Sequence, residues 1–405
     1  MALINSAMSC SAGVSSSLDD FDNVIDHYLR YSPDTLTLLD TLHQQDPEFA
    51  MGHVFKGYQL KMASDPRLLP ALDQSIAAAR ASAGHPREQA HVAVLDAWRR
   101  DNSRQASDAL ATILADHPTD LIALKAANHL HFYRGDAEGM RTEILASLPH
   151  WAKDHPWRNF VLGMLSFGHE ECGDYKAAQH YGEAAVDAEP LDMWAAHAVA
   201  HVHQMQGTYT DGITWIEQCG KQWTHTNNFG HHLTWHKALM LLARGQTEAA
   251  LEVYDRELLD CLQDDFYLDI CNAASLLWRL DLAGIALGER WQVLLDYVHR
   301  CHDQELVFIS LHYLIVAAKN HDQGAIDQAM SNLKAWSLRP IEQGEVCNTV
   351  GLAIATAIVD LTSGHQARGL AVLAKALPEL HLIGGSHAQR ELFFDVSQHY
   401  QKELL

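Results

Sequence analysis

Residues 173–190 read GDYKAAQHYGEAAVDAEP, and this stretch decides the fold class. Gly173 marks a short turn between two helices. Ala178 and Ala185 are seven residues apart, so they lie on one face of the following helix, where small side chains let a partner helix approach closely. Pro190 ends that helix, because proline cannot continue the hydrogen-bond ladder. The stretch therefore predicts the second helix of a tight helical hairpin.

The same hairpin recurs along the chain. Turn glycines at Gly135, Gly173, Gly207 and Gly245 are separated by 38, 34 and 38 residues, a spacing that indicates a repeat array. Apolar residues recur at i, i+3 and i+4 and alternating β-branched runs are rare, which predicts an all-α protein. The pattern resembles the tetratricopeptide repeat. It implies a right-handed α-solenoid of tetratricopeptide-like helical hairpins over 17–405, after a flexible stretch at 1–16 and with a C-terminal segment (about 378–405) able to close it.

In an array of this kind the first helix of each hairpin lines the concave surface. With the turn glycine counted as position 15, positions 2, 5, 6 and 9 commonly contact ligand in proteins that resemble this fold. Six ring-bearing side chains of two adjacent hairpins occupy those positions: Trp194, His197, His201, His232, Trp235 and His236. We therefore expect them to converge on one groove, which His129 extends. Packing of both tryptophans in the core is the equally weighted alternative.

Three other histidines occupy a different position in the repeat. His131, His169 and His203 each lie four residues before a turn glycine, at a position that normally packs between helices. We interpret them as a packing column in which one ring nitrogen of each is satisfied locally. The 27 histidines of the chain thus divide into a groove population and structural ones.

Composition limits the partners. The formal net charge of −22 and the lack of a long Lys/Arg run argue against nucleic acid. Seven scattered cysteines without a CxxC pattern indicate free thiols in a reducing compartment. We see no signal peptide at the N-terminus, and the apolar run GLAIATAIVDL at 351–361 is too short to cross a bilayer. These features predict a soluble cytoplasmic protein without a membrane partner.

Several segments are similar, in order, to the tetratricopeptide repeat protein 38 family over at least 160–395. WAAHAVAHVHQMQG at 194–207 follows the pattern WxxHxVAHxxxMxG, and HLTWHKAL at 232–239 follows HxxWHxAL. The family's motif residues correspond here to Asp192, Trp194, His197, His201, His232, Trp235, His236, Asp255, Ser275, Arg279, Gly384, Gly385, Ser386, Gln389 and Arg390. The resemblance implies the repeat fold and the site, but no settled reaction.

The sequence departs from the family pattern at three positions. Gln204 stands where members usually have Glu, Asn272 stands in place of Asp, and His169 replaces an apolar residue. If the missing carboxylates were catalytic, this chain would be impaired or altered in activity.

A metal site is the first candidate chemistry. His197/His201 and His232/His236 are both i, i+4 pairs, so each pair lies on one helix face and the two pairs can supply four imidazole ligands to a divalent transition metal. A carboxylate such as Asp192 or Asp255 can orient a ring from behind. Against a metal, no HExxH motif occurs and four-histidine sites are less common than mixed ones. Nitrogens of His201, His232 and His236 more than about 8 Å apart would exclude both a shared metal and a compact catalytic set.

Metal-free catalysis is the second candidate. One of His201, His232 and His236 would serve as the base, Arg279 or Arg390 would bind an anion, and Ser386 in GGSHAQR would act as nucleophile or binder. The competing and favoured interpretation of GGSHAQR is a helix N-cap followed by a structural arginine.

A ligand- or partner-binding groove is the third candidate and the function we predict, with an enzyme acting on a small polar substrate as the alternative. The occupant is a small molecule or a peptide, and the density of His and Trp favours a small enclosed ligand. A homodimer is also allowed. The predicted ligand-binding residues are Trp194, His197, His201, His232, Trp235, His236, Arg279, Ser386 and Arg390.

Overall fold

The computed structural model describes residues 10–297 and 305–404, and every regular element within them is helical. The all-α prediction is confirmed. The helices of the first half are α1 (Ser17–Leu29), α2 (Thr35–Gln45), α3 (Ala50–Met62), α4 (Leu69–Ser82), α5 (Pro86–Arg99), α6 (Ser103–Asp116), α7 (Leu121–Arg134), α8 (Ala137–Ser147), α9 (Arg158–Glu171), α10 (Tyr175–Ala188) and α11 (Met193–Met205). The second half has α12 (Tyr209–Cys219), α13 (Phe229–Ala243), α14 (Thr247–Val253), α15 (Tyr267–Leu282), α16 (Arg290–Leu295), α17 (Val307–Lys319), α18 (Gln323–Ser337), α19 (Glu342–Val346), α20 (Leu352–Thr362), α21 (Gln366–Ala376) and α22 (His387–Glu403).

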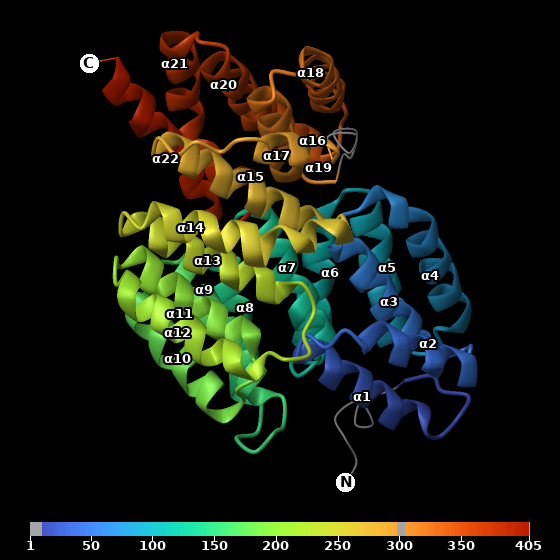
Figure 1. Cartoon of the computed structure of the whole chain (residues 1–405). Helices are drawn as coiled ribbons and strands as arrows, with labels where there is room; N and C mark the ends of the chain where they lie inside the picture. The colour runs from blue at the N-terminus through green and yellow to red at the C-terminus, as the bar shows by residue number, and fades with distance from the viewer. Residues whose placement is uncertain (1–9, 298–304, 405) are drawn as a thin grey trace. The chain divides into compact units, whose positions relative to one another are not determined.

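Consecutive helices pack as hairpins, which Figure 1 shows along the chain. Contacts join α3 to α4, α5 to α6, α9 to α10, α17 to α18, and α20 to α21. The predicted turn glycines adopt left-handed backbone, with φ of +77° at Gly173 and +72° at Gly207. A residue with a Cβ is strained there, so glycine is needed for its backbone and not for lack of space. The repeated hairpin that the sequence predicts is therefore the building unit of the protein.

The chain divides into two compact units. The first contains residues 1–131, 137–199 and 219–229, and the second contains 132–136, 200–218 and 230–405. The boundaries fall inside helices, since α11 is divided after Val199 and α13 after Phe229. Of the stretch predicted to be flexible, residues 1–9 lie outside the described residues, whereas the backbone N–H groups of Ser11 and Gly13 donate to Glu88 and Asp46.

Gly212 of α12 explains one irregularity of the repeat. The sequence has glycine where alanine is usual in this fold. A Cβ there would lie 2.6 Å from Sδ of Met240 and 2.8 Å from Cβ of His203. Such distances are too short for any side chain, so α12 approaches α11 and α13 closely enough to require glycine.

The apolar run at 351–361 belongs to a longer helix than the sequence analysis assumed. Glu342–Thr362 is one continuous helix of 21 residues with a mean hydropathy of 1.4, so its length and composition meet the requirement for a membrane span. Slightly more than half of its most apolar window, 56%, is buried inside the protein. The α20 part packs on α17, α18 and α21, and Ile354 and Ile358 are core residues. The short run at 351–361 is therefore part of a helix that is long enough to span a bilayer, and this helix packs as a core helix does.

Candidate functional site

Helices α11 and α13 carry the four histidines that the repeat spacing singled out. His197 and His201 are one turn apart on α11, and His232 and His236 are one turn apart on α13. One ring nitrogen of each histidine lies within 4.8 Å of one from each of the others. The rings of His201 and His236 have centroids 4.4 Å apart, and those of His232 and His236 are 4.8 Å apart. These separations are well below the distance of about 8 Å that would exclude a shared ligand.

All four histidines are buried. His201 and His236 expose none of their surface, and His197 and His232 expose 2% and 4%. Burial disfavours a charged imidazolium. At His232, burial and the neighbouring His201 lower the pKa to about 3, so this ring is neutral at physiological pH. A neutral imidazole is the form that binds a metal ion.

Two amide side chains orient rings of the cluster. Nδ1 of His236 lies 2.8 Å from Oε1 of Gln204, so the ring donates its Nδ1–H to the amide oxygen and Nε2 carries the lone pair. Nδ1 of His232 lies 3.1 Å from Nδ2 of Asn272 on α15. These two amides are two of the positions at which the sequence differs from the pattern of the family that it resembles. The departures therefore lie directly behind the cluster.

The carboxylates of Asp192 and Asp255, which the sequence offers for this orienting role, instead form contacts that stabilise the fold. Oδ1 of Asp192 accepts from the backbone N–H of Ala195 at 3.0 Å and so caps α11. Asp255 binds Arg290 through two hydrogen bonds of 2.7 and 2.6 Å. Sequence reasoning had noted Gln204 and Asn272 only as departures from a motif, and that anomaly was the signal for their role.

Aromatic rings surround His197. Its ring centroid lies 5.3 Å from those of Phe167, Trp194 and Phe229. The ring of His129, which the sequence predicts to extend the site, stacks on Trp194 with centroids 6.1 Å apart. Trp194 is 9% exposed, so these rings form a closed aromatic environment on one side of His197.

Trp235 is completely buried, and its ring stacks on His232 with centroids 5.3 Å apart and an interplanar angle of 16°. The tryptophan therefore contacts the cluster from within the core.

The C-terminal candidates maintain the fold around α22. Oγ of Ser386 accepts from the backbone N–H of Gln389 at 3.3 Å, while Oε1 of Gln389 accepts from the backbone N–H of Ser386 at 2.9 Å. This is a capping box. Arg390 donates to the carbonyl oxygen of Gly385. Arg279 binds Asp395 at 2.9 Å, the carbonyl oxygen of Ala388 at 3.0 Å and the hydroxyl of Ser275. The structure thus supplies the contacts expected for an N-cap with structural arginines.

The three column histidines each contact a nearby polar group. Nε2 of His131 lies 3.3 Å from the Glu143 carboxylate, and Nδ1 of His169 lies 3.3 Å from that of Asp174. Nδ1 of His203 lies 2.8 Å from the Thr208 hydroxyl. At His203 this contact is a hydrogen bond, whereas at His131 and His169 it is an ion-pair distance to a carboxylate.

Comparison with known proteins adds little to this site. No protein-family model matches the sequence. Among solved structures, the chain is similar to one in a structure described as Naa15/Naa10 bound to HypK-THB, with 12% identity and a TM-score of 0.28. The match covers 90% of this chain and 64% of that one, so the chain spans less than two thirds of the protein it matches. A likeness this distant carries no conclusion about function, which rests on the residues described above.

Proposed function

We propose that this protein is a helical-repeat binding protein whose ligand is a divalent transition-metal ion held by His197, His201, His232 and His236. The observation that carries the proposal is the convergence of four buried imidazoles, with one nitrogen of each within 4.8 Å of the others. In a tetrahedral zinc site the metal–nitrogen bonds are about 2.0–2.1 Å, which sets neighbouring nitrogens about 3.3 Å apart. Binding would require the four nitrogens to move from their present spacing, within 4.8 Å of one another, to that value.

The donor set determines which ions fit. Imidazole suits zinc, copper, nickel and cobalt, whereas magnesium and calcium require oxygen ligands. The His236 ring donates to Gln204 and so has its Nε2 lone pair available for bonding. An amide can also serve His232: a half-turn of the Asn272 side chain presents its oxygen to Nδ1 and places the lone pair on Nε2. These contacts are of the kind that orient metal-binding histidines.

The test is metal binding by protein purified without a histidine tag. We expect one zinc ion per chain by elemental analysis, and visible absorption bands of tetrahedral cobalt when Co²⁺ is titrated into metal-free protein. His201→Ala and His236→Ala should each abolish stoichiometric binding. His180→Ala, at an exposed histidine of α10, is the matched control and should bind as the unmodified protein does. Failure of the unmodified protein to bind any of these ions would refute the proposal.

An enzyme is the second candidate, and the surroundings of His197 favour considering it. With His197 held among three aromatic rings, the remaining three histidines would leave one coordination position for water. Zinc lowers the pKa of such a water to about 7 and makes it a nucleophile. Hydrolysis of p-nitrophenyl acetate by the zinc-loaded protein, lost in His201→Ala and kept in His197→Ala, would support this function. The burial of the cluster favours binding over turnover, because a substrate has to reach the metal.

Other parts of the predicted function stay proposals of the same kind. An array of helical hairpins supports binding of a protein or peptide partner along its surface. The resemblance to the tetratricopeptide repeat protein 38 family is supported by the sequence motifs around the four histidines. Cys10, Cys172, Cys219, Cys261, Cys271 and Cys347 are free thiols, which supports a reducing compartment such as the cytoplasm.

A further inference from the structure

The four histidines of the proposed metal site are closed off from solvent. None of them is more than 4% exposed. An ion in solution therefore reaches them only if part of the surrounding structure moves, because a closed site needs a local opening. The rings around His197 indicate which part moves, since they belong to elements of different exposure: Phe167 on α9, Trp194 on α11 and Phe229 at the start of α13.

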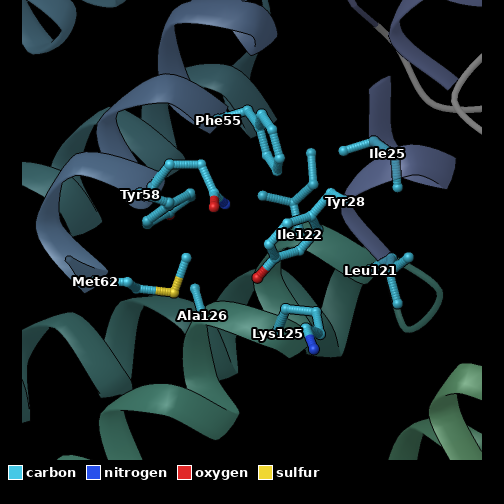
Figure 2. Close-up of a pocket in the computed structure, with 10 residues that line it drawn as sticks. Ile25, Tyr28, Phe55, Tyr58, Met62, Leu121, Ile122, Lys125 and Ala126 are labelled. Carbon is cyan, nitrogen blue, oxygen red and sulfur yellow. The ribbon is translucent and has the colours of Figure 1, made fainter. Parts of the chain in front are cut away.

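Two of these rings are held in place by their surroundings. Phe167 is fully buried, and Trp194 is 9% exposed. Nζ of Lys125 lies 5.5 Å from the ring centroids of Trp194 and Tyr28, and Figure 2 shows Lys125 and Tyr28 on the wall of a small cavity. The ring of His129 stacks on Trp194, and its Nδ1–H donates to the carbonyl oxygen of Lys125 at 3.1 Å. A movement of Trp194 would break these contacts together.

The third ring belongs to a segment that moves more easily. Residues 223–228, which precede α13, form no helix, and Phe229 directly after them is partly exposed. Its ring stacks on that of Tyr31, with centroids 4.6 Å apart and an interplanar angle of 16°, and Tyr31 is also partly exposed. The Phe229 centroid lies 5.3 Å from that of His197. A pair of partly exposed rings therefore covers His197 on this side.

Polar contacts join the same segment to the turn between α1 and α2. The backbone N–H of Asn227 donates to the carbonyl oxygen of Tyr31 at 2.7 Å. Nε2 of His225 lies 3.0 Å from Oδ2 of Asp34, and these side chains are 67% and 55% exposed. Exposed ion pairs contribute little to stability and weaken in salt. Contacts of this kind break and reform locally, which suits a segment that opens while the core stays folded.

The backbone of Tyr31 indicates that its ring is needed at this place. Tyr31 follows α1 in left-handed backbone with φ of +56°, where glycine or asparagine is usual. Its N–H donates to the carbonyl oxygen of Tyr28, and the N–H of Ser32 donates to that of His27. The conformation is strained for tyrosine, and strain of this kind is retained where the side chain has a use. Stacking on Phe229 gives the ring a use that glycine could not supply.

We propose that residues 223–229 form a gate over His197, which the ring of Tyr31 holds closed and which opens locally to admit a divalent metal ion. The inference rests on the proposed metal-binding function for the ion that passes, whereas the opening itself can be measured in metal-free protein. Because the gate closes over the empty and the loaded site alike, it governs the rates of metal loading and release and leaves the affinity unchanged. A stacked aromatic pair shifts such an equilibrium toward the closed form by about twofold to tenfold.

Reaction of the metal-free full-length protein with diethyl pyrocarbonate, read at each histidine by tandem mass spectrometry, tests the opening. Tyr31→Gly removes the ring and relieves the backbone strain, so His197 should react about twofold to tenfold faster. Tyr31→Phe keeps the stacked ring and is the matched control, in which the rate should be unchanged. His91, which is completely buried and bound to Asp120, is the internal control and should react at the same slow rate in all three proteins.

Zinc exchange with a chromophoric chelator tests the purpose of the opening. In Tyr31→Gly, loading and release should both become faster by the factor found for His197, with an unchanged dissociation constant. Unchanged reaction of His197 in Tyr31→Gly, an equal increase in Tyr31→Phe, or an equal increase at His91 would each overturn the gate. Faster reaction of His197 with unchanged zinc exchange would overturn it as the route of the ion. Faster reaction of His197 in a protein that binds no zinc would support the opening and refute only the proposed metal function.

Discussion

A buried histidine of α5 and the buried histidine cluster on α11 and α13 have opposite surroundings. Nδ1 of His91 on α5 lies 2.9 Å from the Tyr58 hydroxyl, and its Nε2 lies 3.0 Å from Oδ2 of Asp120. Nε of Arg87 donates to the same carboxylate oxygen at 2.6 Å. In the cluster, by contrast, His232 and His236 are oriented by the neutral amides of Asn272 and Gln204.

The difference separates two uses of a buried imidazole. Both nitrogens of His91 are engaged by fixed partners, and Arg87 balances the charge of Asp120, so this network is complete by itself. Although burial opposes ionisation of Asp120, Arg87 and His91 hold the pKa of its carboxyl well below the usual value. The cluster brings four imidazoles together, with neutral amides behind two of them, which is an arrangement that an added cation completes. The two regions should therefore respond to different perturbations.

The largest effect is expected from Asp120→Ala in the complete network. Removal of this carboxylate leaves Arg87 buried at 5% exposure without its counter-charge and removes a partner of His91. Loss of one partner of a buried ion pair typically costs about 3–5 kcal/mol, and chemical denaturation of metal-free protein would measure it. Asp73→Ala, at an exposed pair with Arg99, is the control and should cost at most about 1 kcal/mol. Equal losses of unfolding free energy in the two variants would show that the buried network contributes no more than an exposed ion pair.

The second effect is a gain of metal affinity in Asn272→Asp. A carboxylate only accepts, so it would hold the proton on Nδ1 of His232, leave the lone pair on Nε2 and add negative charge behind the metal. Changes of this kind alter metal affinity by about 10–100-fold, and competition with a chromophoric zinc chelator would measure it. Unchanged zinc affinity would contradict the orienting role of Asn272.

Gln204→Glu provides the comparison for that variant. Burial and Asp395 raise the pKa of Glu391 on α22, while Arg279 and the Gln204 side chain oppose the rise. A glutamate at 204 would therefore stand beside a second carboxylate, and we expect a smaller gain in zinc affinity than in Asn272→Asp.

The sequence was sufficient for the parts of this comparison that depend on local periodicity. The spacing of Gly173 and Gly207 predicts the hairpins, because a turn and the helices beside it are set by nearby residues. The repeat positions of His201, His232 and His236 then predict their convergence, since positions 2, 6 and 9 of adjacent hairpins face the same groove.

The contacts that distinguish the two regions could not be predicted from the sequence. Gln204 reaches a histidine 32 residues away, Asn272 reaches one 40 residues away, and each contact depends on the rotamers of two side chains. The network at His91 is of the same kind, as it joins residues 29 and 33 apart.

The third effect is a loss of stability in acid that depends on His232. The pKa of His232 is about 3 in the folded protein and about 6.5 in the unfolded chain. Between these values the unfolded chain binds a proton at this ring and the folded protein does not. The contribution of the neutral ring to the free energy of unfolding is therefore complete above pH 6.5 and decreases as the pH falls toward 3. Between pH 7 and 5 the loss for this residue is about 2 kcal/mol. In urea denaturation, the free energy of unfolding of metal-free His232→Asn should decrease between pH 7 and 5 by about this amount less than that of the unmodified protein.

The smallest effect is expected from Tyr58→Phe, which removes one member of the complete network without removing charge. Because Nε2–H of His91 donates to Asp120, Nδ1 accepts from the Tyr58 hydroxyl, and phenylalanine deletes that donor alone. A single neutral hydrogen bond contributes about 0.5–1.5 kcal/mol, so denaturation should detect a loss of about 1 kcal/mol. Zinc affinity should be unchanged, since this hydroxyl contacts the framework histidine and not the cluster. A change in zinc affinity as large as that expected for Asn272→Asp would mean that the two regions are coupled, and that the separation between a structural and a ligand-binding histidine does not hold in this protein.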